Sequence, residues 1–329
     1  MTTERTSLPT FGDIEDAAAR LKGMAVETPM IRNDALDAAT DARVWVKAEV
    51  LQRTGSFKFR GAYNRISRLN AGERDAGVVA FSSGNHAQGV ALAAQIVGCP
   101  AVIIMPSDAP ALKIEATRGY GAEVILYDRH TEDREALGRG VAAERGAILV
   151  PPYEDFFVIA GQGTAGREAA LQLAERGERA DMVVPPASGG GLLGGTALSF
   201  EALSPTTVVW VAEPEGHDDH RRSLMAGERV RNAGGSSQLC DALMSPEPGE
   251  LTFALNRTRV AGGVGVSDAE VFAAMRFAFR HLKLVMEPSG AVPLAALLAG
   301  KLPAAGKTVV LIASGGNVDP ALFAQALAV

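Results

Sequence analysis

The sequence predicts an α/β protein with two lobes, each built on an open parallel sheet, and a cleft between them. Short β-branched runs alternate with alanine-rich stretches of helical length, the pattern of a parallel sheet covered by helices. Three glycine-rich loops each follow a predicted strand. The length of 329 residues suits two domains or one large one.

The first lobe is predicted from a compact strand–helix series between about residues 75 and 150. Short apolar runs bounded by turn residues are typical of buried strands, and the longer alanine-rich stretches are typical of helices. The predicted strands lie within 75–83, 100–106 and 122–128, and the predicted helices are 85–98, 109–121 and 134–146.

The second lobe is predicted from a similar series further along the chain. Its predicted strands lie within 181–187, 206–213 and 307–316, and its predicted helices are 163–175, 192–203 and 268–282. The stretch 228–266 is rich in Gly, Ser and Pro, so we expect it to be mostly loop.

Composition excludes several classes of protein. The formal net charge is −6 without a basic stripe, so neither nucleic acid nor a membrane surface is an expected partner. The N-terminal residues lack the apolar core of a signal peptide, and the longest apolar runs are too short to span a bilayer. The two cysteines, Cys99 and Cys240, lie far apart, which argues against a disulfide framework or a zinc cage. We expect a cytoplasmic protein that acts on small molecules.

Lys58 stands in the stretch LQRTGSFKFRGAYN, between two phenylalanines and two glycines. Desolvation among apolar neighbours disfavours the charged form of an amine, and a neutral lysine is a nucleophile toward carbonyl groups. The alternative is a lysine that extends from an amphipathic helix into solvent.

Two of the glycine-rich loops are candidate anion sites. In SSGNHAQG (82–89), Gly84 frees the backbone and Asn85 suits a helix start, where N–H groups and the helix dipole attract anions. The alternative is a capped turn. In ASGGGLLGG (187–195), three successive glycines let several amides converge on a phosphate.

The second loop also carries a competing interpretation. Gly189, Gly191 and Gly194 form a G-x-G-x-x-G pattern, and Glu213 follows Gly194 by 19 residues. This is the dinucleotide fingerprint with its acidic residue, so a nicotinamide-dependent oxidoreductase remains possible. The third loop, LIASGGN (311–317), places Ser314 where α/β sheets bind ligands, unless it is a simple turn serine.

Six ordered motifs together resemble the fold-type II pyridoxal-phosphate enzymes (tryptophan synthase β-like), specifically the threonine/serine dehydratase and serine racemase family. The motifs are GSFKFRGA, SSGNHAQGVA, VIAGQGT, SGGGLLGG, EPSGAV and ASGGNVD, and they cover nearly the whole chain. The resemblance implies pyridoxal 5′-phosphate in the interdomain cleft. It also implies a large discontinuous domain, 1–70 and 152–329, and a small mobile domain, 71–151.

The resemblance assigns roles around the cofactor. Lys58 resembles the Schiff-base lysine, Phe57 the ring beside the pyridine face, and Asn85 the partner of the 3′-oxygen. Ser314 corresponds to the serine that faces the pyridine nitrogen. The phosphate loop would comprise Ser188, Gly189, Gly190, Gly191 and Leu192; the family usually has a further glycine where this chain has Ser188.

Substrate residues follow from the same resemblance. The substrate carboxylate would bind the loop Ser82, Ser83, Gly84, Asn85 and His86. Ser83 matches the acid/base of the racemases on the opposite cofactor face from Lys58, although it could simply cap the loop. Ser245 matches a substrate-side position. Arg134 could receive a second carboxylate such as that of 3-hydroxyaspartate, unless it is a surface arginine.

The segment AEPEGHDDH (212–220) resembles the divalent-cation segment of the family. Glu213 and Asp219 would supply carboxylates and His217 its backbone carbonyl, an oxygen set suited to Mg²⁺, Mn²⁺ or Ca²⁺. The alternative is a solvated acidic turn.

The implied activity is β-elimination from L-threonine, L-serine or a related 3-hydroxy amino acid, with release of a 2-keto acid and ammonia. The alternatives are an amino-acid racemase, a β-replacing synthase and the nicotinamide dehydrogenase. The resemblance also implies a homodimer. It does not rank the substrates.

Overall fold

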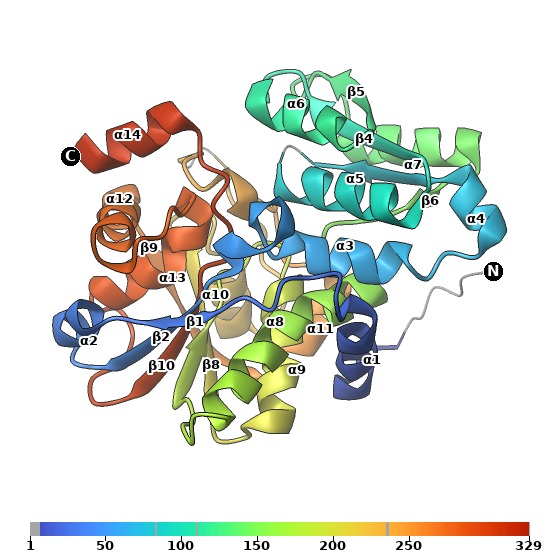
Figure 1. The fold of residues 1–329 in the computed structure, drawn as a ribbon. Helices are drawn as coiled ribbons and strands as arrows, with labels where there is room; N and C mark the ends of the chain where they lie inside the picture. Colours follow the sequence, from blue (N-terminus) through green and yellow to red (C-terminus); the bar gives the residue numbers. More distant parts are fainter. Residues whose placement is uncertain (1–6, 83, 110, 235–236, 329) are drawn as a thin grey trace.

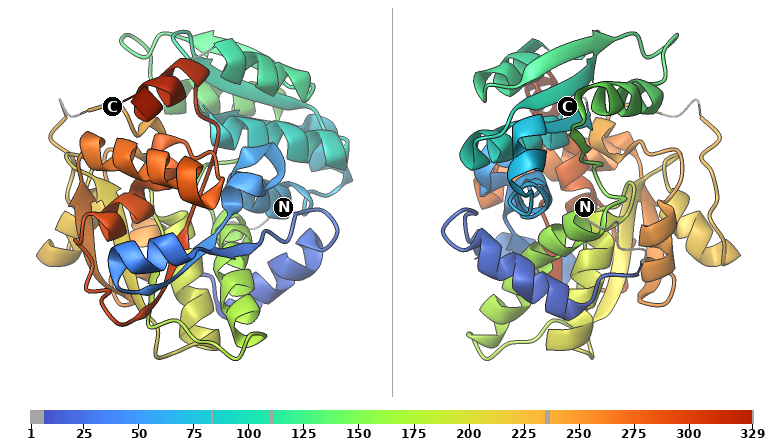
Figure 2. Two further views of the ribbon diagram at one scale, coloured as in Figure 1. Left: turned by 60° about the vertical axis from the view of Figure 1, so that its left-hand side comes forward. Right: turned by 90° about the vertical axis from the view of Figure 1, so that its right-hand side faces the viewer.

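The computed structural model describes residues 7–82, 84–109, 111–234 and 237–328. Two separate sheets, each with helices on both faces, form the two parts of the molecule (Figures 1 and 2). The predicted α/β class with two parallel-sheet units is therefore confirmed. Among the described helices, none has both the length and the apolar character needed to cross a membrane.

The larger sheet has six strands in the order β1-β2-β10-β7-β8-β9. Only β1 runs antiparallel to its neighbour; the other pairs are parallel. The strands are β1 (Met30–Arg32), β2 (Arg43–Lys47), β7 (Met182–Val184), β8 (Val208–Pro214), β9 (Val260–Val266) and β10 (Thr308–Ile312).

Successive side chains of each strand point to opposite faces of this sheet, and helices bury the apolar side chains on both faces. Val44 and Val309 belong to the core under α12 (Asp268–Phe277) and α13 (Pro288–Leu298). Trp45 and Val310 belong to the core under α8 (Phe156–Ala174) and α9 (Gly191–Leu203). The remaining elements of this part are α1 (Phe11–Leu21), α2 (Asp34–Thr40), the 3₁₀ turns η1 (Glu49–Leu51), η2 (Arg53–Gly55) and η3 (Asp241–Leu243), α10 (Asp219–Ala226), α11 (Glu250–Asn256), the π-turn η4 (Ala278–Leu282) and α14 (Pro320–Ala328).

The smaller sheet is wholly parallel, with the strand order β5-β4-β3-β6. Its strands are β3 (Val78–Phe81), β4 (Ala101–Pro106), β5 (Glu123–Tyr127) and β6 (Ile148–Leu149), and its helices are α4 (Ala71–Ala76), α5 (Asn85–Val97), α6 (Ala111–Gly119) and α7 (Arg134–Arg145). The domain boundaries drawn from the sequence, 70/71 and 151/152, remain predictions.

The stretch 228–266 is mostly irregular, as predicted, but it also contains α11 and all of β9, which pairs with β8 as the edge strand of the larger sheet. Glycine is unfavourable in most strands, but here small residues are needed because neighbouring side chains press on the backbone. A Cβ at Gly263 would lie 2.6 Å from Val211, and one at Gly262 would lie 3.2 Å from Trp210. Tertiary packing therefore overrides the local propensity.

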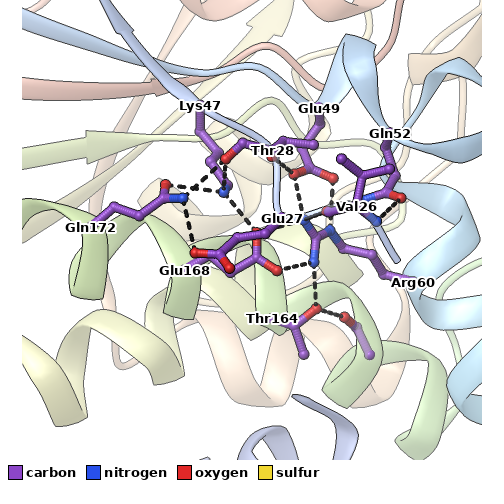
Figure 3. Close-up of polar contacts among 12 residues, drawn as sticks. Val26, Glu27, Thr28, Lys47, Glu49, Gln52, Arg60, Thr164, Glu168 and Gln172 are labelled. Carbon is purple, nitrogen blue, oxygen red and sulfur yellow. Dashed lines mark hydrogen bonds and ion pairs between the residues drawn. The ribbon is translucent and has the colours of Figure 1, made fainter. Parts of the chain in front are cut away.

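The helix α3 (Lys58–Ile66) lies between the two parts and packs against both α5 and α8 (Figure 1). A buried charged group fixes its position (Figure 3). Arg60 bonds Glu49 at 2.7 and 2.8 Å and Glu168 at 2.6 and 2.7 Å, so its guanidinium forms two bidentate pairs. Lys47 contacts the same Glu168 carboxylate at 2.7 Å. Two cations thus balance two anions directly behind the first turn of α3.

Candidate active site

Lys58 is the first residue of α3, and its side chain faces two adjoining pockets. Its Nζ donates a 2.9 Å hydrogen bond to the carbonyl oxygen of Pro152 and lies 5.1 Å from the ring centroid of Phe57. Burial lowers the pKa of Lys58 from 10.5 to about 8. At neutral pH this amine loses its proton far more readily than a surface lysine does.

The backbone beside Lys58 is held by the loop after β10. Phe57 N donates to Ser314 O at 3.1 Å, and Ser56 pairs with Gly315. A Cβ at Gly89 would lie 3.1 Å from the Lys58 backbone, which explains a small residue there in α5. The position of Lys58 therefore depends on both parts of the molecule.

The first of the two pockets, the glycine-loop pocket, lies at the carboxyl end of β7, where α9 begins. Residues predicted to hold the cofactor line it together: Phe57, Lys58, Asn85, Ser188, Gly189, Gly190, Gly191, Leu192 and Ser314. The first turn of α9 presents N–H groups that have no partner within the helix, and the positive end of its dipole points the same way. This arrangement suits a phosphate.

The glycine triplet is needed for shape as well as for conformation. A Cβ would collide with the Tyr153 ring at Gly189 and with Gln162 Oε1 at Gly191, and it would lie 2.5 Å from His220 Nε2 at Gly190. Gly190 also has a φ of +98°, which side-chain-bearing residues rarely adopt. The loop therefore exposes bare backbone to the pocket, and the residues present fit a phosphorylated cofactor.

Asn85, at the start of α5, and Ser314, after β10, both line this pocket. The Asn85 amide donates to Glu287 Oε1 at 2.5 Å and accepts from Asn317 Nδ2 at 2.8 Å. Glu287 is almost fully buried, and burial with the nearby Asp241 raises its pKa to about 7. The amide of Asn85 is therefore oriented by residues that are distant in the sequence.

The second pocket, the Arg134 pocket, adjoins the first and shares Lys58 with it. Residues predicted to bind substrate line this pocket: Ser82, Gly84, Asn85, His86, Arg134 and Ser245. His86 Nε2 contacts Val150 O at 2.8 Å, and burial lowers the pKa of its ring to about 3, so the imidazole is neutral. Ser83 lies outside the described residues.

Two serines of these pockets bond to each other. Ser188 Oγ donates to Ser245 Oγ at 2.7 Å and accepts from Ser245 N at 3.1 Å. The Ser188 hydroxyl is thus already engaged in this structure. Arg134 lies on the exposed start of α7 with its guanidinium carbon 5.8 Å from the Phe81 ring centroid.

Glu213, at the end of β8, and Asp219, at the start of α10, form a buried acidic pair behind the glycine loop. Glu213 accepts hydrogen bonds from His220 N at 3.0 Å and Arg221 N at 2.8 Å. Burial and the neighbouring Asp219 raise the pKa of Glu213 well above its usual value, and burial raises that of Asp219 to about 7. Two adjacent buried carboxylates are unfavourable without a cation, so the residues present fit a divalent ion.

The third predicted member of that site is the backbone carbonyl of His217, which stays a prediction. The ring of His217 contacts Ser237 O at 3.0 Å. His220 in addition brings its imidazole to within 4.8 Å of the carboxylates of Glu213 and Asp219. Burial lowers the pKa of His220 to about 4.

Sequence reasoning missed four residues of this region: Tyr153, His220, Glu287 and Lys113. Glu287 opens one of the six motifs and His220 ends the acidic segment, so a signal existed for these two. Tyr153 and Lys113 lie in no motif. They reach the pockets only through the packing of the two sheets.

The parallel sheets, the buried lysine and the glycine-loop pocket together define an enzyme built to hold a phosphorylated aldehyde cofactor. The family model for pyridoxal-phosphate dependent enzymes matches residues 22–315, and the chain belongs to that family. The competing dinucleotide interpretation gave Glu213 to a ribose, but this carboxylate is fully buried and accepts hydrogen bonds from the first turn of α10.

Relatives and solved structures agree with this family. The chain is 47% identical to L-threo-3-hydroxyaspartate ammonia-lyase of Pseudomonas sp., covering 97% of this chain and 99% of the relative. It is 40% identical to serine racemase of Schizosaccharomyces pombe, covering 97% and 98%. The crystal structure of a threonine deaminase from T.th. superimposes with a TM-score of 0.88 at 42% identity, covering 94% of this chain and 99% of that chain.

Proposed function

We propose that the protein is an ammonia-lyase that removes water from a 3-hydroxy amino acid and releases a 2-keto acid and ammonia. The best-supported substrate is 3-hydroxyaspartate. One observation carries this choice: Arg134 lines the same pocket as Lys58, so a substrate whose Cα lies near the amine can extend a second carboxylate toward a guanidinium. Relatives named 3-hydroxyaspartate ammonia-lyases at 47% and 44% identity support it.

Lys58 would hold pyridoxal phosphate and, once free, remove the Cα proton of the substrate. The lowered pKa of about 8 suits a base that works near neutral pH. When bound, the cofactor supplies the electron withdrawal that makes this proton acidic. Phe57, Asn85, Ser314 and the loop Ser188 to Leu192 would hold the cofactor in place.

The substrate carboxylate would bind at the amino end of α5. Gly84 precedes this 13-residue helix, and the first-turn N–H groups attract an anion. Ser82, Gly84, Asn85 and His86 surround this position. Ser83 completes the predicted loop, and its role as a second base stays a prediction.

Glu213 and Asp219, with the backbone carbonyl of His217, would hold a divalent cation. The adjacent buried carboxylates support this proposal, since both can be charged only beside a positive ion. His220, beside this site, also lies next to Gly190, so a bound cation would stabilise the glycine loop from the side of α10.

A second candidate activity is amino-acid racemisation. Its support is the 40% identity to a serine racemase over nearly the whole chain. A homodimer and a cytoplasmic location stay predictions from the sequence.

The test is an assay of keto-acid and ammonia release from L- and D-serine, L- and D-threonine, and both diastereomers of 3-hydroxyaspartate. Lys58→Ala should abolish turnover, while the exposed Lys22→Ala should have no effect. Arg134→Gln should lower kcat/KM for 3-hydroxyaspartate by about 10–100-fold, which corresponds to the free energy of one hydrogen bond to a charged group. It should leave L-serine nearly unchanged; equal losses on both substrates would contradict the proposed role of Arg134.

A further inference from the structure

His220 lies beside the proposed cation site, although a site with only oxygen ligands would not need a histidine. Its ring is fully buried, with Nδ1 3.8 Å from Glu213 Oε1 and 3.7 Å from Asp219 Oδ2. Within the described part of the chain, neither this Nδ1 nor Asp219 Oδ2 has a hydrogen-bond partner. Two buried polar atoms without partners therefore face one point, together with a second carboxylate.

The other nitrogen of the ring determines what Nδ1 can do. The backbone of Ser188 lies close enough to the His220 ring to act as a hydrogen-bond acceptor, and Nδ1 has no partner. The Asn256 amide nitrogen lies 3.3 Å from Nε2 and also donates to Gly190 O at 3.2 Å, so Nε2 has its polar partners on the side of the glycine loop. A neutral imidazole with its proton on Nε2 presents a lone pair on Nδ1, the arrangement usual for a metal-binding histidine.

We propose that Nδ1 of His220 is a direct ligand of the cation held by Glu213 and Asp219, and that the site consequently prefers Co²⁺, Ni²⁺ or Zn²⁺ to Mg²⁺ or Ca²⁺. The inference rests on the proposed cation site and corrects its oxygen-only ligand set. Imidazole nitrogen favours the later first-row ions, whereas Mg²⁺ and Ca²⁺ take oxygen ligands.

The geometry agrees with a single ion. Two ligand atoms that are each about 2.1 Å from one metal lie at most about 4.2 Å apart. The separations of 3.7 and 3.8 Å from Nδ1 to the two carboxylates fall inside that limit, and all three groups offer ligand atoms within 4.8 Å of one another. The ring also spans from the carboxylates to the glycine loop, so the ion would be tied to Ser188 through one side chain.

The first experiment titrates chelator-treated holoenzyme with Co²⁺ and with Mg²⁺ by calorimetry. The unaltered protein should bind Co²⁺ at least about tenfold more tightly than Mg²⁺. His220→Asn should weaken Co²⁺ binding by about 10–100-fold, a range that even outer partners of metal ligands reach, and should change Mg²⁺ binding by less than about threefold. The exposed His130→Asn is the matched control and should change neither.

Each outcome separates the nitrogen ligand from the cation site itself. If His220→Asn retains the Co²⁺ preference, or weakens both ions equally, the nitrogen ligand is refuted while the carboxylate site stands. If the unaltered protein binds neither ion, the cation site is refuted as well.

A second measurement needs no substitution and therefore does not depend on how well His220→Asn folds. Pulsed electron paramagnetic resonance of Mn²⁺ bound to the unaltered holoenzyme should show coupling to a directly ligated imidazole nitrogen. A spectrum with coupling to protons alone would overturn the proposal.

Discussion

Glu287 is a carboxyl group whose behaviour is set by burial. Its Oε1 accepts a 2.5 Å hydrogen bond from the Asn85 amide and so orients that side chain. The pKa of Glu287 is raised from 4.5 to about 7. The unfolded chain loses this proton near pH 4.5 whereas the folded chain keeps it up to about pH 7. The unfolded state therefore binds fewer protons in this window, and the contribution of Glu287 to stability falls as pH rises.

Glu287→Gln should remove that dependence. The stability of the variant relative to the unaltered protein should increase between pH 4.5 and 7 with a slope of at most about 1.4 kcal/mol per pH unit. Urea unfolding of the holoenzyme at several pH values measures it, with the exposed Glu228→Gln as control. A difference that stays constant with pH would show that Glu287 is ionised in the folded protein.

At the level of single residues, the sequence predicts those features that depend on immediate neighbours in the chain. Lys58 between phenylalanines and Ser314 after an apolar strand stand out from their neighbours alone. The partnership of Asn85 with Glu287 does not, because 202 residues separate them and only the finished packing of both sheets brings them together. By contrast, His220, Asp219 and Glu213 lie in one short segment, and the turn from β8 into α10 sets the direction of the His220 ring.

The position of α3 depends on the charged group around Arg60 (Figure 3). Arg60 lies in the same first turn as Lys58 and is fully buried between Glu49 and Glu168. Burial by itself would raise the pKa of Glu49, but Arg60 holds it below its usual value. Removing one member of such a group leaves an uncompensated buried charge.

Arg60→Met should therefore destabilise the protein by about 3–5 kcal/mol. Arg145→Met removes an exposed pair with Glu123 and should cost less than about 1 kcal/mol. Chemical unfolding of both variants tests the contrast. Adding Glu49→Gln to Arg60→Met should recover part of the loss; no recovery would mean that packing rather than charge balance explains it.

Elements differ in how well their sequences predict them. The strands β3, β4 and β10 are uninterrupted β-branched or apolar runs, and each lies within its predicted range. The helix predicted at 163–175 is α8, which begins earlier because Asp155 caps it by accepting from Phe157 N and Val158 N. The strand β9 could not be predicted, since its glycines are favourable only against the side chains of β8.

At the scale of the whole molecule, one ion pair connects the two parts across the pockets. Lys113 on α6 lies 2.7 Å from Asp241 in η3, and its Nζ also lies over Gly84. Both residues line the Arg134 pocket. We expect this pair to hold the two parts together at the mouth of the pocket.

Lys113→Met should change the free energy of unfolding by less than about 1 kcal/mol, since the pair is partly exposed. It should increase the rate at which the holoenzyme loses pyridoxal phosphate to a trapping agent, because the pocket opens more readily. Lys301→Met is the control, since Lys301 pairs with Glu215 and Glu270 within the larger part. Cofactor loss at the same rate in both variants would argue against a closing role.

The strand order of the larger sheet has a consequence for folding during synthesis on the ribosome. Strand β10, the last to be synthesised, lies between β2 and β7, and residue 308 pairs with residue 43. The smaller sheet needs only residues 78–149 and can assemble while synthesis continues. The first hairpin must wait for the final strand, and closing so long a loop is slow. Nascent chains should therefore carry a finished small unit beside an unpaired β2 edge, which is where chaperones would be needed most.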